Sequence, residues 1–266
     1  QLSEVQYPTY SESYDYDNRG VLTSSAINAD GKLRKRKWQH DRENREATLT
    51  DAELRATQTQ YDALGRLIKT IDAIKGESSY HYDDKDNLIE VIDPEQRSTR
   101  FEYDRANRLI AEIKQQNNER TEYQYDATGN LEIILSANGE KSQFIYTDAG
   151  LVTETKYYKQ QSDTVAQKSI TYNYNTVGLL SEYNDGTSSA SYDYNANNQL
   201  TDININYGLF SKDYHYSYYP NGLKQSYTNP EGITYYYSYD GNGQLRTLNI
   251  PGEGQISIND YKWTAP

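Results

Sequence analysis

The chain has 266 residues, a formal net charge of −12 and no Cys, which excludes disulfide frameworks and cysteine-ligated metal sites. Leu, Ile, Val and Phe make up roughly 17% of the residues, a share typical of disordered chains. The 29 Tyr residues oppose disorder, because each buried aromatic ring removes on the order of 150–250 Å² from water. The acidic balance argues against nucleic acid as a partner, and no apolar run approaches the roughly 20 residues that span a bilayer. The absence of Met predicts a processed chain or a piece of a longer one.

A motif of about 21 residues recurs along the chain. Nearly every copy begins with two aromatic residues separated by one residue, which is polar in most copies. We call the second of these two positions the anchor, and it is usually followed by Asp or Asn. Period-2 alternation of this kind predicts a strand with one buried face. The anchors are Tyr16, His40, Tyr61, Tyr82, Tyr103, Tyr125, Tyr146, Tyr174, Tyr194, Tyr218 and Tyr239.

A turn follows each anchor, as residues 103–109 show clearly. An Asp or Asn at the first turn position, such as Asp104, accepts hydrogen bonds from amides of its own turn. Three residues later stands Gly, Asn or Asp, and these types tolerate a left-handed backbone. The pattern predicts a type I turn closed by a left-handed residue, which is a common hairpin connection. A Leu such as Leu109 then opens the second strand in most copies.

A second turn is predicted about ten residues before the next anchor in most copies. Pro follows the first turn residue at Pro94 and Pro230, as is typical of such a turn. The first residues of the predicted second turns are Asp30, Asp51, Asp72, Asp93, Asn184 and Asn229.

Three stretches depart from the simple pattern. Residues 41–60 resemble a helix, with a possible capping box at Thr50 and Glu53, but their alignment on the next repeats predicts strand. The long spacing between Tyr146 and Tyr174 predicts an extended hairpin around residues 159–167. Residues 250–261 predict a further repeat that is cut before it completes. The predicted fold class is therefore all-β, with tandem antiparallel β-hairpin repeats of about 21 residues.

These residues resemble the YD-repeat, or RHS-repeat, family, whose pattern is Tyr-x-Tyr-Asp-x-x-Gly-Arg-Leu followed by a turn such as Asp-Pro-x-Gly. Residues 61–67 carry the pattern from the anchor onward, with Thr59 in place of the earlier Tyr. Residues 123–131 carry it with Asn130 in place of Arg. The resemblance covers nearly the whole chain. It implies that the hairpins form a curved spiral sheet, either a partial shell or a small barrel.

We expect residues 1–266 to be a single repeat array of about eleven repeats, with a more irregular, Tyr-rich second half at 151–266. About 22 strands at ~4.8 Å each would give roughly 105 Å of sheet, too little to close around a protein-sized payload. Each hairpin would bury its face only against its neighbours, so stability would come from stacking.

The resemblance also implies a function. In bacterial members of the family the wall resembles a hollow shell around a toxic C-terminal segment, and the related teneurins use a similar shell in cell adhesion. The chain would be a structural segment of a larger protein that is secreted or displayed at the cell surface. Its partners would be the remainder of the parent polypeptide and an encapsulated toxin domain. The self-cleaving closing region of family shells has no counterpart in this sequence.

Catalytic and metal-binding chemistry is not predicted. No nucleophile motif, phosphate loop or metal-ligand spacing is present, so we expect no catalytic residue, no cofactor and no metal site. We interpret His40, His81 and His215 as structural strand residues. The turn Asp residues could line a calcium-binding rim, but we favour the interpretation that each caps its own turn. A polysaccharide-degrading enzyme is a third functional alternative.

A carbohydrate-binding or cell-adhesion module is the main alternative function, because exposed aromatic rings with hydroxyl groups can bind glycans. We interpret the aligned Tyr pairs as core. The basic run at residues 32–37 either binds phosphate or acidic glycans or, as we favour, protects a strand at the N-terminal edge from aggregation. The candidate glycan contacts are the Tyr residues outside the repeat register: Tyr157, Tyr158, Tyr207, Tyr214, Tyr235 and Tyr236.

Overall fold

The computed structural model describes residues 2–43, 45–252 and 254–257, and every regular element in them is a β-strand. The predicted all-β fold of tandem antiparallel hairpins is therefore confirmed. None of the described residues belongs to a helix that is long and apolar enough to cross a membrane. The chain divides into two compact units, unit 1 up to residue 122 and unit 2 from residue 123.

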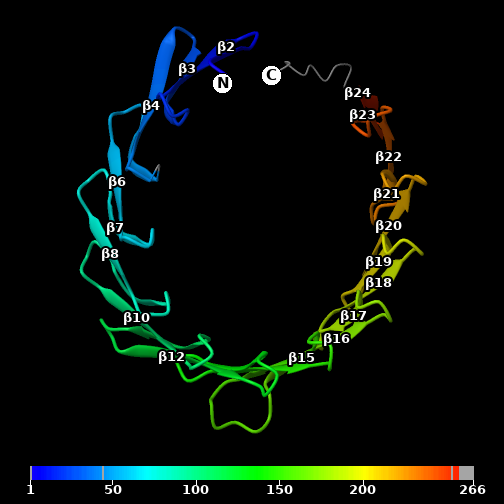
Figure 1. Cartoon of the computed structure of the whole chain (residues 1–266). Helices are drawn as coiled ribbons and strands as arrows, with labels where there is room; N and C mark the ends of the chain where they lie inside the picture. The colour runs from blue at the N-terminus through cyan, green and yellow to red at the C-terminus, as the bar shows by residue number, and fades with distance from the viewer. Residues whose placement is uncertain (1, 44, 253, 258–266) are drawn as a thin grey trace. The chain divides into compact units, whose positions relative to one another are not determined.

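Unit 1 is a meander in which each strand pairs antiparallel with the strand that follows it in the chain (Figure 1). The last strand begins in unit 1 and ends in unit 2. The strands are β1 (Glu4–Gln6), β2 (Tyr10–Tyr16), β3 (Leu22–Ala29), β4 (Lys32–His40), β5 (Glu46–Thr50), β6 (Ala56–Tyr61), β7 (Leu67–Ile71), β8 (Glu77–Tyr82), β9 (Leu88–Ile92), β10 (Ser98–Tyr103), β11 (Leu109–Lys114) and β12 (Glu119–Tyr125).

Unit 2 repeats the same meander of antiparallel strands. Its strands are β13 (Leu131–Leu135), β14 (Lys141–Tyr146), β15 (Val152–Tyr158), β16 (Lys168–Tyr174), β17 (Leu180–Asn184), β18 (Ser189–Tyr194), β19 (Leu200–Asn206), β20 (Ser211–Tyr218), β21 (Lys224–Thr228), β22 (Thr234–Tyr239), β23 (Leu245–Ile250) and β24 (Gly254–Ser257).

The five-residue turn after each anchor, which we call the corner turn, has the predicted geometry. In residues 62–66 the amide of Gly65 donates to the carbonyl of Asp62, and the amide of Asp62 donates to the carbonyl of Arg66, both at 3.0 Å. Gly65 has φ +84° and Asn107, in the same position of its own turn, has φ +61°. The Asp62 Oδ1 atom accepts hydrogen bonds from two amides of the turn, as the capping interpretation predicts. Asn44, predicted to be left-handed, lies outside the described residues.

The turns at the opposite ends of the strands, which we call outer turns, are less uniform than predicted. Several repeat the corner geometry, with Leu54 at φ +64° in unit 1 and Gly232 at φ +78° in unit 2. The turn between β3 and β4 is instead a two-residue connection through Asp30 and Gly31, both with positive φ. The prediction that Asn184 opens a turn is wrong by one residue, because Asp185 makes the closing hydrogen bond to Ser188.

Two of the irregular stretches follow the predictions. Residues 46–50 and 56–61 form strands β5 and β6, so the helical alternative for residues 41–60 is wrong. The β15–β16 connection is an extended loop over residues 159–167 (Figure 1). The Lys141 ammonium donates to the carbonyls of Gln161 and Asp163, at 3.3 and 3.0 Å, and thereby ties the loop to β14. The final repeat is described only as far as the β23–β24 hairpin.

The core is thinner than the sequence predicts. Anchor rings such as Tyr103 are half-buried, and among the described residues no large side chain is fully buried. In each unit a side chain can be covered only by its neighbours in the meander, because the described elements include no second layer. Small side chains between larger neighbours are therefore the best covered. Most of the buried residues in the described part of the chain are small, and the buried set is Ser24, Ala26, Ala111, Leu135, Thr155, Tyr158 and Ala190.

The basic run lies on β4, which is the fourth strand of unit 1, so the prediction of an N-terminal edge strand is wrong. β4 pairs with β3 along residues 32–37, but its ladder with β5 begins only at Lys37. The first five residues of β4 therefore project past β5 with one open side. Protection against edge-to-edge pairing still applies to this open side.

Candidate functional site

We call the place where one corner turn contacts the next a junction. An anchor Tyr lies at the centre of the junctions described below. The Tyr82 hydroxyl donates to the carbonyl of Leu67, in the preceding repeat, at 2.9 Å. Tyr103 makes the same contact with Leu88 at 2.9 Å. Each of these two anchors thus bonds to the residue that opens the second strand of the preceding repeat. The other described hydroxyl contacts of this type are Tyr146 to Leu131, Tyr174 to Val152, Tyr194 to Leu180 and Tyr218 to Leu200.

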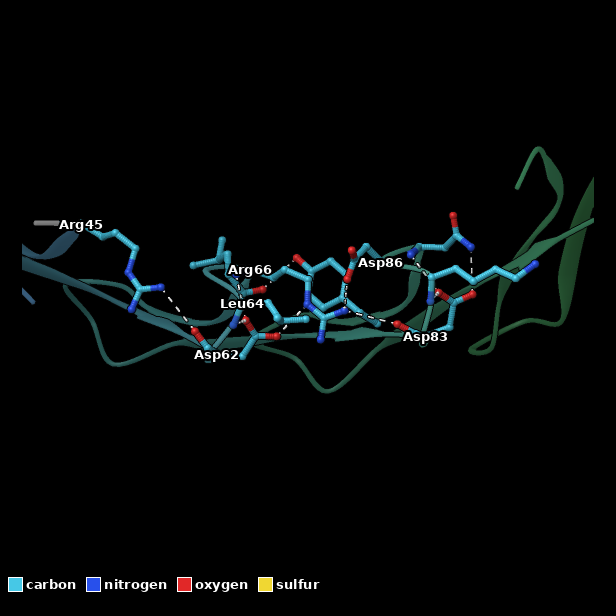
Figure 2. A network of polar contacts seen from close by, with 10 residues as sticks. Arg45, Asp62, Leu64, Arg66, Asp83 and Asp86 are labelled. Atoms are coloured by element: carbon cyan, nitrogen blue, oxygen red, sulfur yellow. Dashed lines mark hydrogen bonds and ion pairs between the residues drawn. The ribbon is translucent and has the colours of Figure 1, made fainter. Parts of the chain in front are cut away.

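Arg66, the last residue of its corner turn, links that turn to the next one (Figure 2). Its Nε donates to Asp62 Oδ2, in its own turn, at 2.7 Å. Its Nη1 reaches the following turn, where it donates to Asp86 Oδ1 at 2.7 Å and to the carbonyl of Asp83 at 3.3 Å. The guanidinium carbon lies 4.8 Å from the centroid of the Tyr82 ring, at cation–π distance. One guanidinium therefore joins two repeats through four contacts.

Arg45 makes the same arrangement one repeat earlier. Its Nη1 points toward the carbonyl of Asp62 at 3.3 Å (Figure 2). Its Nε donates to Asp41 at 2.6 Å, and its guanidinium carbon lies 4.8 Å from the Tyr61 ring centroid. A Cβ atom on Gly65 would lie 3.3 Å from Arg45 Nη1, so Gly65 serves both the positive φ and this close approach. We call Arg45 and Arg66 the stapling arginines.

Electrostatics favour the charged forms of the turn carboxylates. The backbone amide of Arg108 is the main cause that lowers the pKa of Asp104, and the Arg108 side chain adds to it against partial desolvation. The Thr128 hydroxyl, together with amides of its turn, lowers the pKa of Asp126 to about 2. Desolvation raises the pKa of the Tyr103 phenol, which keeps its hydroxyl a donor. These shifts favour the ionised form of the turn carboxylates and the neutral form of the anchor phenol, which are the forms that make the junction contacts.

Two outer turns of unit 1 contain similar ion pairs, but the described contacts of these pairs do not link one repeat to the next. Arg55 bonds to Asp51 at 2.6 Å, and Arg97 bonds to Asp93 at 2.6 Å. Their side chains are 63% and 51% exposed, against 25% for Arg66. All the hydrogen bonds and ion pairs described for Arg55 and Arg97 lie in their own turns. Such exposed pairs contribute little to stability.

In unit 2 the last corner residue is apolar or neutral. Gln199 Nε2 donates to the carbonyl of Gly222 in the next corner turn at 2.9 Å. The Leu151 side chain reaches Gly178 of the next turn, since a Cβ on Gly178 would lie 3.7 Å from it. Leu223 meets Gly243 at the same 3.7 Å. The last corner residue thus contacts the left-handed residue of the next corner turn, whatever its chemistry.

Unit 2 also contains a row of stacked Tyr rings across β20, β21 and β22. Tyr227 lies in the middle, with its ring centroid 5.3 Å from Tyr216, 5.6 Å from Tyr235 and 6.4 Å from Tyr214. Interplanar angles between 15° and 30° mean that the rings cover one another's faces. Lys224 lies 5.1 Å from the Tyr216 centroid. The row buries aromatic faces that a flat glycan platform would have to expose.

The six predicted glycan contacts separate in the structure. Tyr157, Tyr207 and Tyr236 are 40%, 44% and 53% exposed, while Tyr214 and Tyr235 belong to the stacked row.

Tyr158 is 8% exposed and does not offer its ring to a ligand. Its hydroxyl donates to Gln143 Oε1 at 3.1 Å, and the Lys141 ammonium lies 3.9 Å from its ring centroid. The six residues therefore do not form one surface.

The other predicted groups are dispersed. His215 pairs with Asp202 across β19 and β20 on an exposed face, and His81 faces Glu90 in the β8–β9 ladder. In the part of the chain that the structure describes, no three His, Cys, Asp or Glu residues gather into a possible metal site.

The basic run of β4 borders a cavity of about 310 Å³, which Arg34 and Arg36 line together with Asp51, Glu53 and Arg55. Asp51 and Glu53 already bind Arg55.

The roles of Arg45 and Arg66 were missed by reasoning from the sequence. The signal was present, because Arg stands five residues after the anchor at positions 45, 66 and 108. The role of each arginine depends on where the next corner turn lies in space, and local turn chemistry does not predict that position.

Comparisons with known proteins agree with this architecture. Residues 111–262 match the model described as Teneurin YD-shell, and residues 82–115 match the RHS Repeat model. No curated protein matches the sequence.

Three solved structures are among those to which the chain shows similarity. The TcdB2-TccC3-TEV crystal structure is 16% identical, with 92% of this chain and 18% of that chain covered and a TM-score of 0.49. The Photorhabdus luminescens Tc holotoxin pore is 15% identical, with 94% and 20% covered and a TM-score of 0.42. A porin-like protein from Bacteroides uniformis is 13% identical, with 95% and 96% covered and a TM-score of 0.28. The chain thus spans about a fifth of the toxin-complex chains that it matches.

Proposed function

Because the chain belongs to the teneurin YD-shell family, we propose that it is a structural segment of a larger polypeptide and forms part of a β-wall. We propose that residues 1–266 act as a single array of repeats within that wall. Its partners are then the remainder of the parent polypeptide and a toxin or other C-terminal domain that the wall encloses or presents. Such a protein acts outside the cell, as a secreted or surface-displayed molecule.

The repeated junction carries this proposal. In six described repeats the anchor hydroxyl bonds to the opening residue of the preceding repeat's second strand. These recurring anchor contacts join one repeat to the next. Such contacts are typical of a repeat protein, in which each repeat is stabilised by packing against its neighbours.

Deletion of one whole repeat tests the structural role. Removal of residues 62–82 joins Tyr61 to Asp83 and leaves every remaining corner turn in register. We expect the shortened chain to fold with an unchanged β-sheet circular dichroism spectrum per residue. Removal of residues 62–72 alone should abolish cooperative folding, since it deletes the corner turn and β7 and joins the end of β6 to the remainder of an outer turn. Equal behaviour of the two deletions would contradict the proposal.

Enclosure is tested in the parent polypeptide. If the repeats form a wall around a C-terminal domain, that domain resists added protease in the intact protein. It becomes sensitive once the junctions are weakened, for example by Tyr82→Ala together with Tyr103→Ala. Protease sensitivity that is equal with and without these changes would show that the wall does not enclose the domain.

Carbohydrate binding is the second candidate function, and the exposure of Tyr157, Tyr207 and Tyr236 favours it. Tyr236 is 53% exposed and neighbours the stacked row along β22. A glycan array would give saturable binding that is lost in Tyr236→Ala and kept in Tyr158→Phe. Absence of binding to both neutral and acidic glycans would contradict carbohydrate binding, and the structural role would then be the one proposed function that remains.

We propose no catalytic role. The families matched are built of shell repeats, and the ionisable groups described at the junctions are engaged in turn capping and repeat joining. Turnover of any member of a polysaccharide panel by the purified chain would overturn this part of the proposal.

A further inference from the structure

The junction that follows Arg66 lacks a stapling arginine. Asn87 occupies the last position of the corner turn 83–87, where Arg45 and Arg66 stand in the two preceding turns. Its Nδ2 donates to Asp83 Oδ2 at 2.9 Å and points toward Asn107 Oδ1 at 3.3 Å. Asn87 thus reproduces two contacts of Arg66, to its own turn Asp and to the left-handed residue of the next turn. The shorter side chain supplies no guanidinium to the ring of Tyr103.

A cavity of about 320 Å³ lies at this junction, between the corner turns 83–87 and 104–108. Phe101 and Tyr103 give it aromatic walls, and Asp83, Asp84 and Asp104 give it carboxylates. Tyr103 corresponds in the repeat to Tyr82, which carries the Arg66 guanidinium 4.8 Å from its ring centroid. Among the described residues no cation lies over the Tyr103 ring.

The charge of the cavity fits a cation. Asp84 is exposed, and its carboxylate makes no hydrogen bond or ion pair with the described part of the chain. Asp83 is bonded within its own turn, and Asp104 is paired with Arg108 at 2.7 Å. Lys85 is the cation that lines the cavity. An aromatic ring beside carboxylates and turn carbonyls is the environment that the chain itself gives to the guanidinium of Arg66.

We propose that this junction is a binding slot for the guanidinium group of an arginine side chain presented by a partner polypeptide. The incoming group stacks on Tyr103, bonds to the carbonyl of Asp104 as Arg66 bonds to that of Asp83, and pairs with Asp84. The planar fork of guanidinium fits such a site better than the compact ammonium of Lys does. The slot adds a docking point within unit 1 to the structural role of the chain.

The test uses the whole 266-residue chain and N-acetyl-arginine amide, with binding followed by saturation-transfer NMR. We expect saturable binding in the millimolar range, and binding at least about tenfold weaker for N-acetyl-citrulline amide, which keeps the shape and lacks the charge. N-acetyl-lysine amide should also bind more weakly. Equal binding of the arginine and citrulline compounds, or of the arginine and lysine compounds, would overturn the proposal.

Asn87→Arg gives the sharpest variant, because its own guanidinium should fill the slot. This variant should lose binding of N-acetyl-arginine amide and gain thermal stability, so loss of binding cannot be ascribed to misfolding. Asn130→Arg, at the same turn position in unit 2, is the matched control and should bind as the unchanged chain does. Lys85→Gln should bind more tightly, since it removes a competing cation. Unchanged binding in Asn87→Arg would show that the compound binds elsewhere, which contradicts the proposed site.

Discussion

Unit 1 and unit 2 build the same junction with different side chains. In unit 1 the last corner residue is Arg at Arg45 and Arg66, and the guanidinium joins carboxylate, carbonyl and aromatic ring across two repeats. In unit 2 the same position holds Leu151, Gln199 and Leu223, which reach the next turn through apolar contact or an amide. The backbone of the corner turn is common to both units.

The comparison teaches that backbone and junction chemistry are separable. Type I geometry with a left-handed fourth residue needs only the first and fourth positions to be suitable. The fifth position is then free to be charged or apolar, provided that it reaches the next turn. Ionic junctions respond to salt and pH, whereas aromatic and aliphatic junctions respond to loss of buried area. We therefore expect salt and acid to destabilise unit 1 more than unit 2, and loss of buried side-chain area to destabilise unit 2 more.

The largest expected effect falls in the stacked row of unit 2. Tyr227→Ala removes a ring that contacts three others, so we expect a loss of about 2–3 kcal/mol of unfolding free energy for a half-buried aromatic. Tyr227→Phe keeps the ring and should cost little. Urea unfolding followed by circular dichroism measures both variants. Similar losses for Ala and Phe would contradict the account of the row.

The anchor hydroxyl should matter less than the ring. Tyr103→Phe removes the hydrogen bond to the carbonyl of Leu88, so we expect a loss of about 1 kcal/mol in urea unfolding. Tyr218→Phe in unit 2 breaks the equivalent bond to Leu200 and should cost the same. A cost confined to one unit would show that the hydroxyl contact is not a shared element of the junction.

The outer turns offer a smaller effect with opposite sign in the two units. Leu54 holds φ +64°, and Gly232 fills the equivalent position in unit 2. Leu54→Gly should stabilise the chain by about 0.5–1 kcal/mol, because relief of the left-handed strain exceeds the entropic cost of Gly. Gly232→Leu should destabilise it by a similar amount. Thermal unfolding curves that shift in the same direction for both variants would contradict this reading of the turns.

Acid should act mainly on unit 1, which carries five of the corner Asp residues. The folded-state pKa of Asp104 lies below the unfolded value, so its contribution to stability is present above about pH 4 and is lost as pH falls through the lowered pKa. The same holds for Asp17, Asp41, Asp62 and Asp83. Hydrogen exchange measured at pH 5 and near pH 3, after correction for intrinsic rates, should show greater opening in unit 1. A uniform change would contradict the assignment.

Much of the fold could be predicted from the sequence because its determinants are local. Asp104 and Asn107 specify a turn by their own bonding and backbone preference, and alternation around Tyr103 specifies a strand. The depth of burial could not be predicted, since it depends on whether a second layer covers the strands. The role of Arg66 was missed for a similar reason, because its partners Asp83 and Asp86 belong to the following repeat.

The left-handed Leu54 could not be predicted either, because its residue type argues against the conformation that its turn imposes. Some Tyr residues outside the repeat register are buried and others are exposed. The difference depends on contacts with other strands, which the local sequence pattern does not predict. Tyr158 lies buried beneath Lys141, whereas Tyr157, its neighbour in the chain, is 40% exposed.

The most direct test of the central claim is hydrogen exchange of the whole chain at neutral pH in low salt and in about 1 M NaCl, where the screening length falls to about 3 Å. If guanidinium contacts join the repeats of unit 1, salt should speed exchange of amides in residues 41–87. Residues 192–239 should keep their protection or gain some, because salt does not weaken aromatic packing. The same response in both regions would contradict the claim that one backbone junction is ionic at Arg45 and Arg66 and built from uncharged side chains in residues 192–239.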